Sequence, residues 1–117
     1  MTFEGRVITG KGRGRGLGFP TINLEIPEHF DIQEGIYAVR VSLDIKTFKG
    51  AMHFGPIPVF GDLKQSLEVF LLDFDSVGVP QTLSFEILQY LRPIQNFDSP
   101  KALAAQIAKD IEAVRAL

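Results

Sequence analysis

The chain of 117 residues is long enough for one domain with a single core, and its 45% hydrophobic and 22% charged residues are ordinary for a globular protein. A formal net charge of −2 provides no overall attraction to nucleic acid or to an anionic membrane, and the absence of cysteine excludes disulfides and thiolate zinc sites. No apolar run could span a bilayer and no signal-peptide pattern is present, so we expect a cytoplasmic protein without a membrane partner.

The first predicted strand covers residues 2–9 and leads into the segment 10–23, which reads G-K-G-R-G-R-G-L-G-F-P-T-I-N. Its glycines allow positive φ angles and close approach of the backbone to a ligand, while Lys11, Arg13 and Arg15 make it cationic. Backbone N–H groups and cations together suit phosphate oxygens. A mobile surface loop is the other interpretation of these residues.

The end of this segment predicts a short strand over residues 21–26. Thr21 and Asn23 are two residues apart, so both side chains leave the same face of that strand. Two neutral oxygens beside a phosphate-binding loop suit Mg²⁺, which completes its shell with phosphate and water. Local hydrogen bonding of the two side chains is the alternative. The glycine spacing fits neither a Walker sequence nor a Rossmann turn.

Three longer strands and a helix are predicted further along the chain. Residues 35–45 alternate between apolar and mostly polar side chains, which predicts a strand with one face on the core and the other largely in water. A turn at 44–46 leads to a partner strand at 47–54. The prolines of 55–61 indicate a loop or flap, and strands at 66–74 and 82–91 follow. Ser99 is a good N-cap and Pro100 a good first helical residue. The helix then extends to near the C-terminus with its core face on Leu103, Ile107, Ile111 and Val114.

Glu68 is a candidate catalytic carboxylate. Strand alternation predicts that it shares a face with Phe70, Leu72 and Phe74. Desolvation beside aromatic rings would raise the proton affinity of the carboxylate and suit it to general acid or base chemistry. The alternative is a carboxylate in water at a strand end.

About six short antiparallel strands followed by one helix predict a mostly β fold. We expect a closed or nearly closed, Greek-key-like six-stranded antiparallel β-barrel, with one C-terminal α-helix packed across one side. No internal repeat or low-complexity segment interrupts the chain. Residues 1–117 are therefore expected to form a single domain.

Four blocks, in the right order and covering essentially the whole chain, resemble riboflavin kinase, also called flavokinase. They are G-x-G-R-G-x-x-L-G-F-P-T-x-N-L near the start, G-I-Y-A-V-x-V at 35–41, L-E-V-x-L-L-D-F at 67–74 and L-R-P-x-x-x-F-D-S at 91–99. The chain resembles in particular the C-terminal kinase domain of bacterial bifunctional riboflavin kinase/FMN adenylyltransferases. Four ordered blocks are far more specific than one glycine-rich loop.

The resemblance implies an enzyme that phosphorylates riboflavin at the ribityl 5′-hydroxyl with ATP, giving FMN and ADP, and that uses Mg²⁺ or another divalent cation. It assigns Glu68 as catalytic base and Thr21 and Asn23 as metal ligands. It assigns flavin binding to Arg92, Gln95 and Phe97. The nucleotide-binding residues that it implies are Gly10, Lys11, Gly12, Arg13, Gly14, Arg15, Gly16, Gly18, Pro20, Thr21 and Asn23.

The rim of the implied site departs from the family pattern, at Gly16, His53, Ile57, Phe70, Val79 and Ile94. Because the residues of the chemistry are retained, we expect an active kinase with altered nucleotide or flavin affinity. One alternative is a non-catalytic flavin or nucleotide binder on the same barrel. Another is an RNA-binding barrel that uses the basic loop, against which the acidic net charge stands. We expect no nucleic-acid partner and a monomer, or a part of a bifunctional FMN adenylyltransferase as in relatives.

Overall fold

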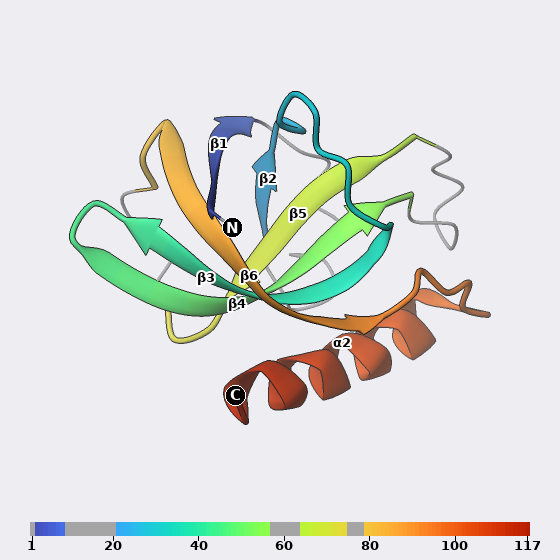
Figure 1. Ribbon diagram of the computed structural model, residues 1–117. Helices are drawn as coiled ribbons and strands as arrows, with labels where there is room; N and C mark the ends of the chain where they lie inside the picture. Colours follow the sequence, from blue (N-terminus) through green and yellow to red (C-terminus); the bar gives the residue numbers. More distant parts are fainter. Residues whose placement is uncertain (1, 9–20, 57–63, 75–78) are drawn as a thin grey trace.

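The structure is a computed structural model that describes residues 2–8, 21–56, 64–74 and 79–117 (Figure 1). Every strand pairing in it is antiparallel, and the sheet closes on itself in the order β1-β2-β5-β4-β3-β6. The predicted six-stranded barrel with a C-terminal helix is confirmed. Its elements are β1 (Thr2–Ile8), β2 (Ile22–Leu24), β3 (Gly35–Leu43), β4 (Lys46–Gly55), β5 (Ser66–Leu71), β6 (Thr82–Arg92) and α2 (Pro100–Arg115).

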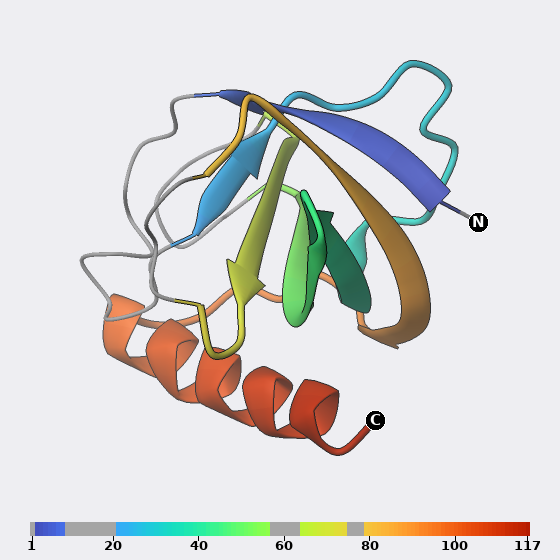
Figure 2. The ribbon, with the colours of Figure 1, turned by 90° about the vertical axis from the view of Figure 1, so that its left-hand side faces the viewer.

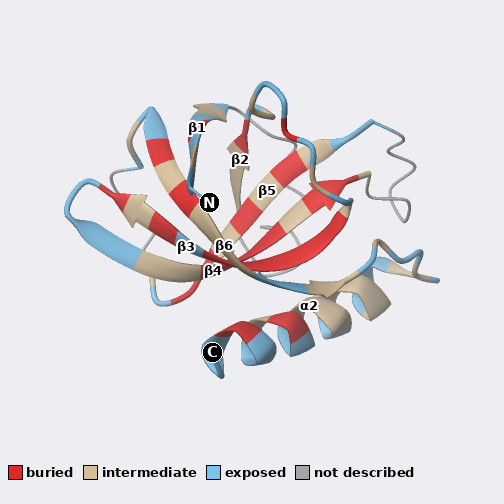
Figure 3. Ribbon diagram, viewed as in Figure 1, coloured by how far each residue is buried: buried red, intermediate tan, exposed pale blue. Residues whose placement is uncertain are grey.

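The barrel interior is filled by alternate residues of each strand, because successive side chains of a strand point to opposite faces. Along β5 the alternation is complete, with Leu67, Val69 and Leu71 buried and the residues between them only partly buried (Figure 3). Strand β6 contributes Leu83 and Phe85 to the core, with Ile87 packed against it. The largest interior residues without exposed surface are Phe85, Leu24, Met52, Leu67, Val39, Val41 and Val69.

Helix α2 packs against the outside of the barrel, and Figures 1 and 2 show it along the same side in both views. The helix covers small residues on the outer face of β3 and β4, Ala38 and Ala51, both of which are buried. Val114 is fully buried there, and Ile111 packs against the same cluster. The prediction of a largely wet outer face for β3 is therefore wrong at Ala38, because the helix excludes water from it.

The start of α2 follows the predicted capping. The Ser99 hydroxyl accepts a hydrogen bond from the Ala102 N–H at 3.1 Å, and Pro100 is the first helical residue, where its missing N–H costs nothing. Among the described residues, no helix is both long enough and apolar enough to cross a membrane.

Two strand predictions extend too far. Strand β5 ends at Leu71, and Asp73 adopts a φ of 60° that turns the chain. Phe74 therefore does not share the face of Glu68; it packs against the barrel core and meets the Phe48 ring edge-on at 5.2 Å. Strand β3 ends at Leu43, and Ile45 lies 97% exposed in the turn instead of continuing the apolar face.

The second predicted strand is also shorter than expected, since β2 comprises only Ile22–Leu24. In the predicted loop at 55–61, Gly55 ends β4 and Pro56 follows it, and the remaining residues lie outside the described part of the chain.

Replacing Val114 tests how much the helix contact stabilises the barrel. Val114→Ala removes two methyl groups from a fully buried site and should lower the free energy of unfolding by about 2 kcal/mol. Urea denaturation measures the change. Glu112→Ala, at an exposed position of the same helix, should stay within about 0.5 kcal/mol of the unsubstituted protein. Equal effects of the two substitutions would contradict the packing described here.

Candidate active site

The antiparallel register aligns five residues across five neighbouring strands on the outer face of the barrel. Asn23 of β2 lies opposite Glu68 of β5, and Glu68 lies opposite His53 of β4. His53 lies opposite Ile36 of β3, which in turn lies opposite Arg92 of β6. Directly opposed residues have Cβ atoms roughly 4.5–5.5 Å apart. We call these five residues the cross-strand row.

The cross-strand row faces outward because the residues next to it in sequence fill the interior. Leu24, Met52 and Val69 each neighbour a member of the row, and all three belong to the barrel core. Glu68 is partly buried in the middle of β5. The expected alternative of a position at the strand end is therefore wrong for Glu68.

Asn23 lies on the outer side of β2, and Thr21 lies directly before that strand. Ile22 and Leu24, which alternate with them, pack into or against the barrel core. Both Thr21 and Asn23 are partly buried, and Asn23 is also paired with Ile8 of β1. Strand pairing thus brings Asn23 next to Glu68, while Thr21 immediately precedes the strand.

The oxygen ligands at this edge fit a hard divalent cation whose remaining ligands come from phosphate and water. Side-chain oxygens of Thr21 and Asn23, beside the Glu68 carboxylate, are the ligand type that Mg²⁺ accepts. Within the described residues no cluster of three or more histidine, cysteine, aspartate or glutamate side chains could hold a metal by itself.

Most of the predicted nucleotide-binding residues lie outside the part of the chain that the structure describes. They are Gly10, Lys11, Gly12, Arg13, Gly14, Arg15, Gly16, Gly18 and Pro20, and Ile57 is also outside it. Of the other rim positions, Val79 is 37% exposed and Phe70 packs against the cluster beneath α2. Ile94 lies over Gly55, where an added Cβ would meet its Cγ1 at 3.1 Å.

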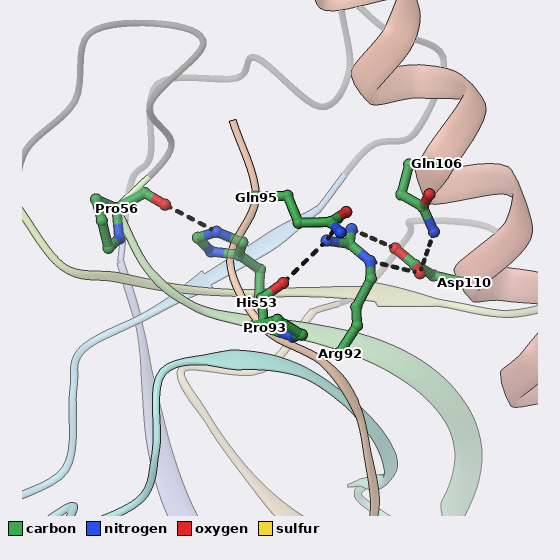
Figure 4. A network of polar contacts seen from close by, with 7 residues as sticks. All are labelled: His53, Pro56, Arg92, Pro93, Gln95, Gln106 and Asp110. Atoms are coloured by element: carbon green, nitrogen blue, oxygen red, sulfur yellow. Dashed lines mark hydrogen bonds and ion pairs between the residues drawn. The ribbon is translucent and has the colours of Figure 1, made fainter. Parts of the chain in front are cut away.

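The predicted flavin-binding residues gather where β6 ends, and Figure 4 shows two of them, Arg92 and Gln95. Arg92 Nη1 donates to the Pro93 carbonyl at 3.3 Å and to Gln95 Oε1 at 3.4 Å. The Arg92 guanidinium carbon lies 5.8 Å from the centroid of the Phe97 ring, within the range of a cation–π contact. The structure thus brings Arg92, Gln95 and Phe97 together.

Sequence reasoning missed Asp110, a helix residue that is only 5% exposed. Its carboxylate accepts hydrogen bonds from Arg92 Nε at 2.9 Å and Nη2 at 2.7 Å, and from Gln106 Nε2 at 3.2 Å. A signal was present, because Asp110 follows Ile107 by three residues and precedes Val114 by four. A carboxylate on the apolar side of a helix indicates a buried partner.

His53 is a neutral imidazole between Glu68 and the Arg92 end of the row. Burial, as the largest cause, lowers the pKa of His53 to about 4; the positive charge of Arg92 adds to this, while the Pro56 carbonyl and Glu34 oppose it. His53 Nε2 lies 3.1 Å from the Pro56 carbonyl oxygen, so the neutral ring donates its Nε2–H there. Nδ1 then carries a lone pair, and it is buried without a hydrogen-bond partner among the described residues.

The lowered pKa of His53 predicts a pH-dependent stability. Since the folded value of about 4 lies below the ordinary 6.5, the unfolded chain binds the proton more readily between these values. The stabilisation is present above pH 6.5 and is lost as pH falls toward 4. The free energy of unfolding should therefore drop by up to about 2 kcal/mol between pH 7 and pH 5, as measured by urea denaturation.

His53→Asn should reduce this drop, because asparagine does not titrate. His29→Asn is the matched control, since His29 is exposed and its φ of 56° is one that asparagine tolerates. It should leave the profile unchanged. A profile that depends on His29 and not on His53 would contradict this assignment.

Residues 1–117 match a family model described as Flavokinase: Riboflavin kinase. The chain is 37% identical over 111 residues to the RNA-binding riboflavin kinase RibR of Bacillus subtilis, with 94% of this chain and 48% of that protein covered. It is 37% identical over 113 residues to the bifunctional riboflavin kinase/FMN adenylyltransferase of Haemophilus influenzae, with 96% and 37% covered. The chain thus spans less than half the length of these relatives.

Two solved structures have a similar fold. A macrolide-efflux protein from Streptococcus pneumoniae superposes with a TM-score of 0.85 at 27% identity, over 99% of this chain and 38% of the other. A riboflavin kinase from Trypanosoma brucei superposes with a TM-score of 0.66 at 19% identity, over 98% and 77%. The second likeness is one of fold alone.

Proposed function

The chain belongs to the riboflavin kinase (flavokinase) family, and we propose that it transfers the γ-phosphoryl group of ATP to the ribityl 5′-hydroxyl of riboflavin, giving FMN and ADP. The observation that best supports this activity is the cross-strand row, in which the Glu68 carboxylate lies between Asn23 and His53 on the outside of a closed barrel. We propose that residues 1–117 act as one riboflavin-kinase-like domain.

Phosphoryl transfer requires a protein mainly to position two substrates and to stabilise negative charge on the transferred phosphoryl group. The oxygen of the ribityl hydroxyl bonds to the γ-phosphorus, and Glu68 accepts the proton that this hydroxyl loses. The bond between that phosphorus and the bridging oxygen breaks, and ADP leaves. Because the acceptor of the proton is a partly buried carboxylate on a rigid strand, its direction toward the hydroxyl is set by the fold.

Thr21 and Asn23 would hold Mg²⁺ or another divalent cation through their side-chain oxygens. Bound metal would offset negative charge on the nucleotide phosphates. Asn23 and Glu68 are opposed on adjacent strands, so the metal ligand and the proton acceptor are separated by one strand spacing, about 4.8 Å. We assign the nucleotide phosphates to the glycine-rich segment 10–18, which directly precedes these ligands in the chain.

The flavin end of the site is proposed at Arg92, Gln95 and Phe97, on the far side of the row from Asn23. Phe97 offers a ring for contact with the flavin. Most donors of Arg92 are engaged by Asp110, Pro93 and Gln95. A role in holding the segment 93–97 therefore suits Arg92 better than a direct contact with the flavin.

We infer no nucleic-acid partner, because the chain carries a net charge of −2. The words "RNA-binding" in the name of the Bacillus subtilis relative describe that protein. Retention of RNA by this chain at physiological salt, in a filter-binding assay, would contradict this inference.

Incubation with riboflavin, ATP and Mg²⁺, followed by chromatography with fluorescence detection of FMN, tests the activity. Glu68→Gln should lower kcat at least about 100-fold, because the amide cannot accept the proton, and calorimetry should find ATP binding retained. The control Glu86→Gln alters an exposed carboxylate of β6 that is paired with Arg40, and it should leave kcat unchanged.

Undiminished turnover in Glu68→Gln would remove that residue from its role. Failure of the unsubstituted chain to form FMN with any of several nucleotides and divalent ions would overturn the kinase proposal. Riboflavin binding without turnover would instead identify a non-catalytic flavin binder.

The metal ligands predict a separate kinetic effect. Thr21→Ala and Asn23→Ala should each raise the Mg²⁺ concentration for half-maximal velocity about tenfold, the equivalent of one lost contact of roughly 1.4 kcal/mol. The measurement is a Mg²⁺ titration at saturating ATP and riboflavin. Thr82→Ala, at the exposed start of β6, is the control and should leave the titration unaltered. Identical titrations for all three variants would exclude Thr21 and Asn23 as ligands.

A further inference from the structure

We propose that Asp110 is a positioning residue for flavin binding, which acts through Arg92 on Gln95 and Phe97. This inference rests on the proposed function and adds to it a helix residue outside the family blocks. The Arg92–Asp110 pair is called the helix clasp below, because it joins the end of β6 to the middle of α2 (Figure 4).

The helix clasp is largely removed from solvent, and most donors of Arg92 are engaged. The exposed fractions of the two side chains are 13% for Arg92 and 6% for Asp110. Two parallel N–H···O bonds join the guanidinium to the carboxylate, and Gln106 of the same helix donates a third bond to Oδ1. Such a fork fixes the plane of the guanidinium as well as its position.

Net stability is a poor explanation for this pair. Removing two charges from water costs about as much as their attraction returns, and apolar residues of the same size often stabilise a fold equally well. An apolar pair would fill the gap between α2 and the barrel but would not orient a guanidinium. The geometry therefore points to the orientation of Arg92 as the function of Asp110.

The group that Asp110 orients is in contact with the proposed flavin end. Arg92 Nη1, which does not bond to Asp110, donates to the Pro93 carbonyl and to Gln95 Oε1. The same guanidinium lies over the Phe97 ring. Residues 93–97 are neither strand nor helix, so they lack the regular backbone hydrogen bonds of those elements, and the bonds from Arg92 to Pro93 and Gln95 are among the contacts that hold them.

The C-terminal end of α2 provides an internal comparison. There Arg115 pairs with Asp73 of the turn after β5 at 3.2 Å, with exposed side-chain fractions of 57% and 75%. An exposed pair of this kind contributes little. Both pairs join the same helix to the barrel, but only the helix clasp contacts the segment 93–97. Asp73→Asn is thus a matched control for Asp110→Asn.

The test compares Asp110→Asn and Asp73→Asn in the chain of residues 1–117. Riboflavin affinity is measured without nucleotide by quenching of flavin fluorescence, and KM for riboflavin, KM for ATP and kcat by FMN formation. Asp110→Asn should raise Kd and KM for riboflavin about tenfold, as expected for a loss of roughly 1.4 kcal/mol, with KM for ATP within about twofold. Asp73→Asn should change none of these.

Gln106→Ala provides a second, milder disruption of the helix clasp, which decides the question if Asp110→Asn does not fold. It removes only the third hydrogen bond of the clasp and should raise riboflavin Kd about two- to fivefold. Asp110→Glu retains a carboxylate, so its riboflavin Kd should lie closer to that of the unsubstituted chain than the Kd of Asp110→Asn does. Unchanged riboflavin affinity in folded clasp variants, or equal losses for ATP and riboflavin, would overturn the inference.

Failure of this inference can be told apart from failure of the proposed function. An unsubstituted chain that binds riboflavin without forming FMN would overturn the kinase activity, and the fluorescence comparison would still decide the role of Asp110. An unsubstituted chain that binds no riboflavin would overturn the positioning role outright.

Discussion

Closure of the barrel in one register is the constraint on which the candidate site depends. Because side chains alternate with a period of two, a slip of β5 by one residue would turn Glu68 into the apolar interior and Val69 out of it. The cost of burying an unpaired carboxylate excludes that arrangement. The packing of the core therefore holds Asn23, Glu68 and His53 in line on the outside, although none of them belongs to the core cluster.

The outer face of the barrel is divided between a structural part and a polar part. Under α2 it is apolar, with Ala38 and Ala51 allowing the helix to approach and Val114 buried against them. Beside the helix it is polar and includes the cross-strand row. The Arg92–Asp110 pair lies at the border, since Arg92 belongs to the row and Asp110 to the helix. The helix thus packs against the barrel through Ile111 and Val114 and is linked to the site through Asp110, between one and four residues away.

Local rules predicted much of the fold and part of the site. The alternation of Val39, Val41, Leu67 and Val69 predicted strands because each pattern repeats over neighbouring residues. The helix start followed from Ser99 and Pro100, because capping depends on the residue types at adjacent positions. Strand ends were predicted less well, as Ile45 and Phe74 illustrate: an apolar residue in a turn continues the pattern of the strand before it. The resemblance to the riboflavin kinase family, drawn from four blocks, is confirmed by the family match over residues 1–117.

The order of residues was sufficient for the strand periods, the helix cap and the chemistry of Thr21, Asn23 and Glu68, because these depend on near neighbours and residue type. Their roles in catalysis stay predictions. Folding decided that Glu68 lies between Asn23 and His53, that burial keeps His53 neutral, and that Asp110 meets Arg92. These features depend on strand register and helix docking, which bring together residues distant in the chain, and no local pattern specifies them.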